Sequence, residues 1–389
     1  MKVWPRAGWR KPAALGFVLL TAKHGEGWVV KKILHVAETI KGGVATVIRS
    51  ISTPPEGQDR QYELVYLVPF DQKQELHGID ERNIRTFSRN NRGVLSLLRF
   101  AWQLIRVIFK EKPDVVHLHS TFSGVIGRCV CVLMRPWRTP KIVYCPHAFS
   151  FLMESSPAKQ KAYSLIERLL QKVTDVIICV SQYELDQAAA FGIDRHRMKL
   201  IYNGIHYKKD ELKPDTDSDI RLLFVGRLDY QKGFDVLLKA FSTVERNDLR
   251  LTVVGSAVNS DPVECPAIDS VEYLPWVTPS EVNDLYKKAD ALIVPSRWEG
   301  FAMVPLEGMA MGLPVIASDC TSLPELVKHD TTGYIFGTGD HQALAGILNG
   351  IKKQRLLDLG IEGRKMVRER FSAMLMIQQT YDVYSAKTL

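Results

Sequence analysis

Short apolar runs alternate with longer stretches of mixed polarity along almost the whole chain. Each run has the length of a strand that is buried on both faces of a parallel sheet. The runs predict strands at residues 32–37, 62–68, 84–87, 114–120, 142–146, 175–181 and 199–202, and then at 220–225, 250–255, 271–274, 291–294 and 315–318. The stretches between them predict helices, and this alternation favours parallel sheets with helices on both faces. The sequence therefore predicts the α/β class.

The pattern breaks near the middle of the chain. Asn203-Gly204 follows the last strand of the first half, and residues 207–219 form a polar, linker-like run. A chain of 389 residues is also long enough for about two domains. We therefore expect two α/β domains that are joined near Gly204.

The first 30 residues differ from the rest. Residues 1–20 carry four basic side chains and end in an apolar run, as in a secretory signal peptide. Residues 21–24, however, make a poor cleavage site, and the compact fold is expected to start near Lys31. We interpret residues 1–30 as a non-native extension, caused by a start assigned too early with Val30 as the alternative start, or as a disordered segment.

One stretch of the second half holds most of the candidate functional residues. The loop at 295–300 follows the strand at 291–294, and open α/β sheets bind ligands at this end of a strand. Pro305 fits the first turn of the next helix, and Gly312 fits the position just past its end. The sequence thus predicts a strand–loop–helix–strand unit with a ligand-binding loop.

Two carboxylates belong to this unit: Glu299 in the loop and Glu307 in the expected first turn of the helix. The unpaired N–H groups and the dipole of a helix N-terminus would stabilise a phosphate. Carboxylates next to a phosphate are suited instead to accept hydrogen bonds from sugar hydroxyls. The alternative is an exposed loop glutamate and a second glutamate that only satisfies the helix dipole.

Glycines and cations stand at other strand ends. Gly42 and Gly43 follow the first strand and open a helix, which lets the backbone approach a phosphate, although the GxGxxG fingerprint of dinucleotide-binding proteins is absent. Gly226 and Arg227 follow another strand, and Lys232 opens the next helix. An Arg and a Lys so placed can clamp a diphosphate. The alternatives are a flexible turn and a pair of solvated cations.

Three histidines lie at strand ends. His147 follows the strand at 142–146, at the ligand-binding edge of the sheet, although a lone loop histidine is often structural. His117 and His119 share one face of their strand. They could begin a metal site, but no Cys, Asp or Glu nearby completes it. We therefore favour polar residues at a strand end and expect no metal.

The aspartates at 215, 217 and 219 form overlapping DxD motifs, a pattern that can bind metal. Here they precede a strand in a charge-rich run, so we interpret them as a solvated linker. Six cysteines without CxxC pairs indicate reduced thiols in the cytoplasm. No apolar run reaches the roughly 18–20 residues that span a bilayer.

The net charge of +8 favours anionic partners. Nucleic acid is not an expected partner, because the basic residues are scattered and no motif of that class occurs. The predicted helix at 93–110 has basic residues at near-helical spacing (Arg92, Arg99, Arg106, Lys110) beside Leu95, Leu98, Trp102 and Phe109. We favour a core-facing helix with a solvated basic face. The alternative is a face that rests on anionic lipid, with residues 135–138 as a second basic and aromatic spot.

The motifs together resemble one family. Glu299-Gly-Phe, Glu307 eight positions later and Gly312-Leu-Pro-Val are similar to the signature of the retaining glycosyltransferases of family 4, which have the two-domain GT-B fold. The resemblance extends to Gly42-Gly43, His147, Arg227, Lys232 and Pro324-Glu325. The chain departs from the family at Ala302, where Gly is common, at Gly308, where Ala is common, and at 320–322, which replace a glycine-rich turn.

The resemblance implies a domain organisation and a set of site residues. Residues 31–205 would form an acceptor-side Rossmann-like domain, 206–370 a domain that binds the nucleotide-sugar, and 371–389 a helix that crosses back to the first domain. The implied catalytic residues are His147, Glu299, Arg227 and Lys232. The implied donor-binding residues are Gly42, Gly43, Gly226, Arg227, Lys232, Gly300, Phe301, Ala302 and Glu307. Residues 296–298 would lie near the donor pocket, and neither metal nor cofactor is expected.

The implied reaction is transfer of a hexosyl-type sugar from a UDP- or GDP-linked donor to a glycan or lipid-linked acceptor, with retention. The resemblance also suggests bacterial surface polysaccharide synthesis, such as that of lipopolysaccharide, by a cytoplasmic protein that is peripheral on the inner face of the membrane. The alternatives are a GT-B sugar-nucleotide epimerase and a basic peripheral binding protein. The sugar, the base, the acceptor and the oligomeric state stay open.

Overall fold

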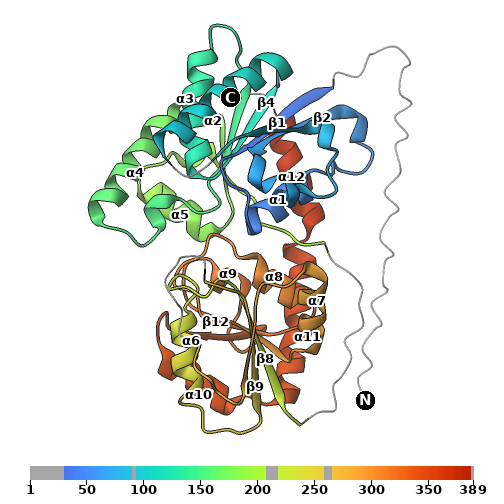
Figure 1. Cartoon of the computed structure of the whole chain (residues 1–389), viewed down its shortest axis with the longest axis vertical. Helices are drawn as coiled ribbons and strands as arrows, with labels where there is room; N and C mark the ends of the chain where they lie inside the picture. Colours follow the sequence, from blue (N-terminus) through green and yellow to red (C-terminus); the bar gives the residue numbers. More distant parts are fainter. Residues whose placement is uncertain (1–29, 90–92, 207–217, 258–264, 387–389) are drawn as a thin grey trace, which may run out of the picture.

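Two parallel sheets form the centres of two lobes (Figure 1). The structure, a computed structural model, describes residues 30–89, 93–206, 218–257 and 265–386. The first sheet has the order β3-β2-β1-β4-β5-β6-β7, and the second has the order β10-β9-β8-β11-β12-β13. The described part leaves out residues 1–29, Arg92 and the aspartates at 215 and 217. The α/β class and the GT-B arrangement of two Rossmann-like domains are confirmed.

The strands closely follow the apolar runs. In the first sheet they are β1 Lys31–Ala37, β2 Tyr62–Pro69, β3 Ile84–Phe87, β4 Val115–His119, β5 Lys141–Cys145, β6 Val176–Cys179 and β7 Met198–Leu200. In the second they are β8 Ile220–Val225, β9 Leu249–Val254, β10 Val271–Leu274, β11 Ala291–Val294, β12 Val315–Ser318 and β13 Gly333–Phe336. The edge strand β13 was not among the predicted strands.

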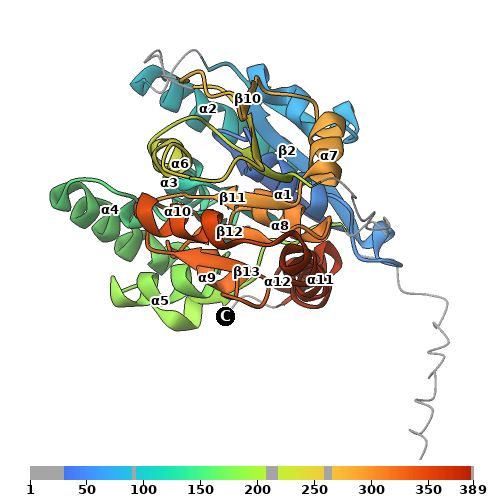
Figure 2. The same ribbon diagram turned by 90° about the horizontal axis from the view of Figure 1, so that it is seen from below.

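Helices cover both faces of each sheet (Figures 1 and 2). In the first lobe they are α1 Gly43–Ile51, α2 Val94–Glu111, α3 Thr121–Met134, α4 Pro157–Leu170 and α5 Gln182–Ala190. The later helices are α6 Phe234–Phe241, α7 Pro279–Lys288, α8 Met303–Ala310, α9 Leu323–Leu326, α10 His341–Gly350, α11 Lys353–Arg370 and α12 Ala373–Ser385. Because helices lie on both faces, a central strand such as β4 is buried along its whole length.

The order of strands reverses at the centre of each sheet. β1 lies between β2 and β4 in the first sheet, and β8 lies between β9 and β11 in the second. In the first sheet the connections that follow β1 and β4 run to opposite sides, and in the second sheet those that follow β8 and β11 do the same. A crevice therefore opens at the carboxyl ends of these strands. Most of the predicted site residues are on the loops that follow β1, β5, β8 and β11, while Gly43 begins α1 and Glu307 lies within α8.

Helix α2 turns a different face to the core than we expected. Its buried apolar residues include Phe100, Leu104 and Ile108, while Leu98 and Trp102 are 61% and 63% exposed. The interpretation of Leu95, Leu98, Trp102 and Phe109 as core residues is wrong. The helix is apolar on two faces, so its sequence does not distinguish the buried one.

The chain crosses between the lobes twice, and the two crossings are hydrogen-bonded to each other. Ile205 N–H donates to the Phe371 carbonyl over 2.9 Å, and Ala373 N–H donates to the Ile205 carbonyl over 3.0 Å. The rings of Tyr202, Phe301 and Phe371 pack together there, with centroids 5.2–5.5 Å apart. Both lobes therefore share one apolar cluster at the crossing.

The last helix packs on the first sheet. The Tyr381 hydroxyl donates to the Ile51 carbonyl over 3.0 Å, and the Lys141 ammonium donates to the Val383 carbonyl over 2.7 Å. Figure 1 shows α12 beside α1 in the upper lobe, while α11 lies in the lower lobe. The chain end thus ties the second lobe to the first.

The close contact of the crossings predicts an effect of Gly204→Ala. A Cβ at Gly204 would lie 2.4 Å from the Ser372 carbonyl oxygen, so one of the backbones must shift. We expect a loss of about 1–3 kcal/mol in the free energy of unfolding, as for other overpacked sites. Gly346→Ala in α10 is the control, because a Cβ there meets no atom within 4 Å and alanine favours a helix. Equal stability of the two variants in urea unfolding would contradict the prediction.

Candidate active site

The loop from β11 to α8 lies where the two lobes meet. A Cβ built on Gly300 would lie 2.0 Å from the carbonyl oxygen of His147, so only a glycine allows this approach. His147 has a φ of 57°, a left-handed conformation that is uncommon for a residue with a side chain. Strained residues of this kind are concentrated at functional sites. The two lobes thus bring two predicted site residues into direct contact.

Glu299, the residue before Gly300, is paired with a cation. Its Oε1 accepts from the Lys232 Nζ and from the Ser296 Oγ, each over 2.6 Å. The side chain is only 7% exposed. Its backbone N–H donates to the Thr321 Oγ1 over 3.0 Å. A nearly buried carboxylate and an ammonium group therefore lie next to each other, fixed by the loops after β8, β11 and β12.

Arg227 lies on the same loop as Lys232. Its Nη1 is 3.1 Å from the Asp229 Oδ2, and its Nη2 donates to the Gln231 Oε1 over 2.5 Å. The Gln231 amide in turn donates to the Trp298 carbonyl over 3.2 Å. The Arg227 side chain is 38% exposed, so it is oriented by its neighbours and still accessible. The loop after β8 is thereby tied to the loop after β11.

Three predicted glycines of the site, Gly42, Gly43 and Gly226, lie at turns that follow β1 and β8. Gly42 has a φ of 75° and begins α1 without a side-chain cap. A Cβ on Gly43 would lie 3.5 Å from Met303, the first residue of α8. Gly226 directly follows β8, and its N–H donates to the Val254 carbonyl at the end of β9. The Gly42-Gly43 turn of the first lobe therefore lies beside the N-terminus of α8.

Helix α8 begins at Met303 with Ala302 as its N-cap, and no side chain caps it. Its end follows the prediction: Gly312 has a φ of 84° and the last carbonyls accept in a Schellman pattern. Gly308 lets α8 approach β11, because a Cβ there would lie 2.8 Å from the Leu292 side chain. Phe301 is buried, and Asn203 Nδ2 donates to its carbonyl over 3.0 Å.

Glu307 is not in the first turn of the helix, so that prediction is wrong. The helix begins at Met303, which puts Glu307 in the second turn. The Tyr286 hydroxyl donates to its Oε2 over 2.9 Å. Burial raises the pKa of Glu307, while the Tyr286 hydrogen bond and the charge of Arg49 oppose this. Because Arg49 belongs to α1, Glu307 also faces the first lobe.

A small pocket spans the two lobes beside Glu299. Trp298, Glu299, Gly300 and Thr321 line it from the second lobe, and Ala148, Phe149, Leu152, Met153, Ser181, Tyr183 and Glu184 line it from the first. Of the stretch 296–298, which we expected near the donor, Arg297 points elsewhere: it pairs with Asp235 over 2.7 Å and stacks on Tyr230. The stretch thus contributes Ser296 and Trp298.

Glu325, which matched the family motif, joins the lobes. Its carboxylate accepts from the backbone N–H groups of Gln182 and Tyr183 over 2.9 and 2.8 Å, at the start of α5 in the first lobe. The Tyr202 hydroxyl also donates to it, over 2.8 Å. The sequence did not predict this contact, because it depends on how the lobes face each other.

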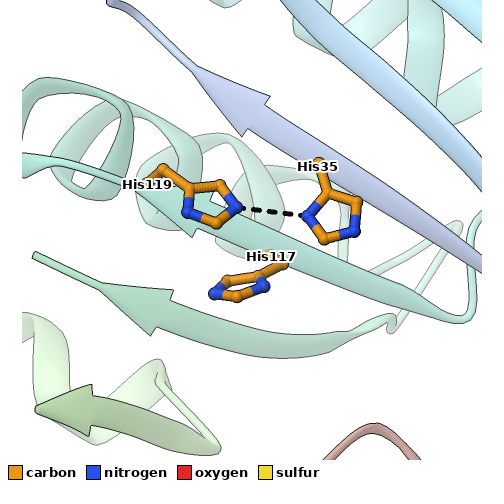
Figure 3. A group of neighbouring side chains, drawn as sticks. All are labelled: His35, His117 and His119. Carbon is orange, nitrogen blue, oxygen red and sulfur yellow. Dashed lines mark hydrogen bonds between the residues drawn. The ribbon is translucent and has the colours of Figure 1, made fainter. Parts of the chain in front are cut away.

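His117 and His119 have a third histidine beside them, a possible ligand that the prediction did not consider, since it looked only for a Cys, Asp or Glu nearby. Figure 3 shows His35 of β1 next to both. One nitrogen of each ring lies within 4.8 Å of the others, a group that could hold a metal ion. All three are at most 2% exposed, and burial lowers their pKa values, that of His35 to about 3. His35 was missed because it sits within an apolar run.

Asp219, the last of the DxD aspartates and the one within the described part, is part of an ion pair. Its Oδ2 lies 3.1 Å from the Arg250 Nη2. Its backbone carbonyl accepts from the Lys353 Nζ. These contacts belong to the base of the second lobe, at the opposite ends of the strands from Glu299.

Comparison with known proteins identifies the family. The model for glycosyl transferases group 1 matches residues 207–369, and that for glycosyltransferase family 4 matches residues 41–209. A 41.2 kDa protein of the cps region of Klebsiella pneumoniae is 33% identical over 327 residues, which cover 82% of this chain and 89% of that protein. This chain belongs to glycosyltransferase family 4. It is therefore a transferase, rather than the epimerase or binding protein considered as alternatives.

A second relative is named as a glycosyltransferase, and a solved structure shares the fold. The lipopolysaccharide 1,6-galactosyltransferase of Escherichia coli K12 is 26% identical over 352 residues, covering 86% of this chain and 92% of that enzyme. The crystal structure of HepE from Anabaena, in complex with UDP and glucose, superimposes with a TM-score of 0.73 at 19% identity, covering 92% and 100% of the two chains. None of the helices in the described ranges is long and apolar enough to cross a membrane.

The contact between the lobes predicts an effect of Gly300→Ala in this glycosyltransferase. The added Cβ collides with the His147 carbonyl, so the two halves of the site must separate. We expect turnover to fall about 100-fold, the cost of a displacement of about 1 Å at a reacting centre. Gly350→Ala is the control, because a Cβ there meets no atom within 4 Å. Normal turnover of Gly300→Ala would mean that this approach is not needed.

Proposed function

We propose that this glycosyltransferase moves a hexosyl-type unit from a nucleotide-sugar, UDP- or GDP-linked, to a glycan or lipid-linked acceptor, with retention at the anomeric carbon. One observation carries the proposal: the Lys232–Glu299 pair lies next to the contact of Gly300 with His147. Cationic and carboxylate groups of the second lobe thus face a histidine of the first. A donor with a charged and a neutral half needs such a combination.

The charged half of the donor would bind to Arg227, Lys232 and the N-terminus of α8. Arg227 can donate to two phosphate oxygens, and Lys232 supplies a point charge. The N–H groups that open α8 have no side-chain cap, and the Gly42-Gly43 turn lies beside them. These groups would offset the charge of the leaving diphosphate without a metal ion. The UDP in the HepE structure supports a nucleoside diphosphate.

The neutral half would lie between Glu299 and His147. A carboxylate can accept from two sugar hydroxyls and stabilise positive charge at the anomeric carbon. His147 orients the sugar from the other side. Glu307, on the second turn of α8, would accept hydrogen bonds from the ribose. Gly226 and Ala302 would leave room for the donor because they are small, while the buried Phe301 would contribute through its backbone.

Retention is proposed without a covalent enzyme intermediate. The bond from the anomeric carbon to the phosphate oxygen breaks, and the acceptor oxygen bonds to the same face of that carbon. The acceptor proton passes to the departing phosphate oxygen. Glu299 already accepts from two side chains, so it serves as a stabilising charge and not as the attacking group.

The donor site predicts a specific result in a thermal-shift screen with UDP, GDP, ADP and their sugars. One nucleotide at about 100 times its Kd should add about 2.7 kcal/mol to the free energy of unfolding. Adding EDTA should not change this shift. Lys232→Ala should lose that shift, while Glu299→Gln should keep it and lower turnover by at least about 100-fold. Lys239→Ala in α6 is the control, since Lys239 lies at the other end of the helix that Lys232 precedes. A shift that survives in Lys232→Ala would contradict the clamp.

A lipid-linked acceptor fits an exposed face of the first lobe. Leu95, Leu98, Trp102 and Phe109 are 47–63% exposed on α2, and the Trp137 ring lies 6.2 Å from that of Phe109. Arg99, Arg106 and Lys110 are exposed on the same helix. We call this set the α2 surface. Exposed tryptophans and basic side chains together favour the interface of an anionic membrane, so we propose a cytoplasmic, peripheral enzyme of surface polysaccharide synthesis.

The α2 surface predicts sedimentation with vesicles. The wild-type protein should bind vesicles that contain anionic lipid and release them at high salt. Trp102→Ser combined with Trp137→Ser should lower the bound fraction at least about tenfold, because about 2 kcal/mol or more of apolar burial is lost. Trp276→Ser is the control, because Trp276 is 51% exposed but belongs to the second lobe. Equal losses in both variants, or none, would count against the assignment.

A further inference from the structure

Behind His147 a row of buried imidazoles runs into the core of the first lobe. His147 Nε2 lies 3.0 Å from His119 Nδ1, and His119 Nε2 lies 3.1 Å from His35 Nδ1. Figure 3 shows the second of these hydrogen bonds. The rings of successive members are nearly parallel, at 18° and 22°. His119 and His35 are 0% and 1% exposed, so water does not compete for these nitrogens.

Each hydrogen bond in this row needs one N–H and one lone pair. Burial lowers the pKa of all three histidines, so each ring is neutral and has a single N–H. The tautomers are therefore coupled. Either every ring carries its proton on the nitrogen towards the site, or every ring carries it on the nitrogen towards the core.

The inner end of the row distinguishes these two arrangements. Among the described residues, His35 Nε2 is buried without a hydrogen-bond partner. In one arrangement this atom is a bare lone pair, and in the other it is an N–H without an acceptor. Buried donors without an acceptor are rarer in proteins than acceptors without a donor. The first arrangement is favoured, and it leaves the proton of His147 on Nδ1.

We propose that His119, held by His35, is a positioning residue that fixes the ring and the tautomer of His147, so that Nδ1–H is offered to the donor. This rests on the proposed role of His147 beside the sugar. An N–H at that place donates to a sugar hydroxyl or phosphate oxygen. His147 has a left-handed backbone conformation, and its ring is stacked on the ring of His119.

Two substitutions of His119 separate positioning from packing. An asparagine at this position can keep a donor near the place of Nδ1, whereas a phenylalanine fills the space without any polar atom. We expect His119→Phe to lower kcat about 10- to 100-fold, the usual cost of losing an orienting partner, with little change in KM for the donor. His119→Asn should recover most of kcat. A purely structural role predicts instead that activity follows the unfolding midpoint, and that result would overturn the proposal.

A second readout does not depend on turnover. In protein labelled with ¹⁵N-histidine, His147 should show a protonated Nδ1 and an unprotonated Nε2, and the two forms should mix in His119→Phe. If this change occurs but no nucleotide-sugar is turned over, the proposed function fails and the control of the tautomer stands. If turnover is normal but His147 carries its proton on Nε2, the proposal is overturned.

The metal content of the purified protein is the last test. One equivalent of a transition metal that is lost in His117→Phe would mean that the three imidazoles are ligands. It would overturn the hydrogen-bonded row, because both ring nitrogens of His119 belong to the row and one of them would then bind the metal ion. Metal-free protein with full activity supports the row.

Discussion

The carbonyl of His147 lies against Gly300, and the rest of the site depends on this contact. Neither lobe has the complete candidate site by itself. The first contributes the histidine and the Gly42-Gly43 turn, and the second contributes the cations, the carboxylates and the start of α8. The close backbone approach at Gly300 sets the distance between the two lobes. Glu325 helps to keep this distance, because its carboxylate accepts hydrogen bonds from the first two N–H groups of α5.

Parallel sheets explain why these groups converge. All strands of a parallel sheet end at one edge, so the loops after β1, β5, β8 and β11 collect there. The reversals of strand order leave crevices at the two edges, and the double crossing of the chain turns the edges towards each other. Short loops then supply the candidate chemical groups. The loop after β8 holds Arg227 and Lys232, and the loop after β11 holds Glu299, whose carboxylate is bound by Lys232 and Ser296.

Much of this fold follows from the sequence, because buried parallel strands are uninterrupted apolar runs. β8, β10, β11 and β12 have the predicted bounds. β13 was missed because Gly333-Tyr-Ile-Phe336 is short and begins with glycine. The buried face of α2 was wrong because that helix is apolar on two faces. The start of α8 was set too late, so Glu307 was put in the wrong turn.

The candidate site residues were predicted from motifs, and motifs do not show which residues lie close together in space. His35 is an isolated polar residue in an apolar strand, and its neighbours His117 and His119 come from a strand far along the chain. Only the pairing of β1 with β4 brings them together. The bridge made by Glu325 likewise needs both lobes. Contacts between residues that are distant in sequence leave no periodic pattern, which is why they could not be predicted.

The most direct test of the central claim is a crystal structure with the nucleotide-sugar that the thermal-shift screen selects, or with an analogue that resists transfer. We predict the diphosphate at Arg227, Lys232 and the N-terminus of α8, and the sugar between Glu299 and His147. A donor bound to the second lobe with its sugar directed away from His147 would contradict the account.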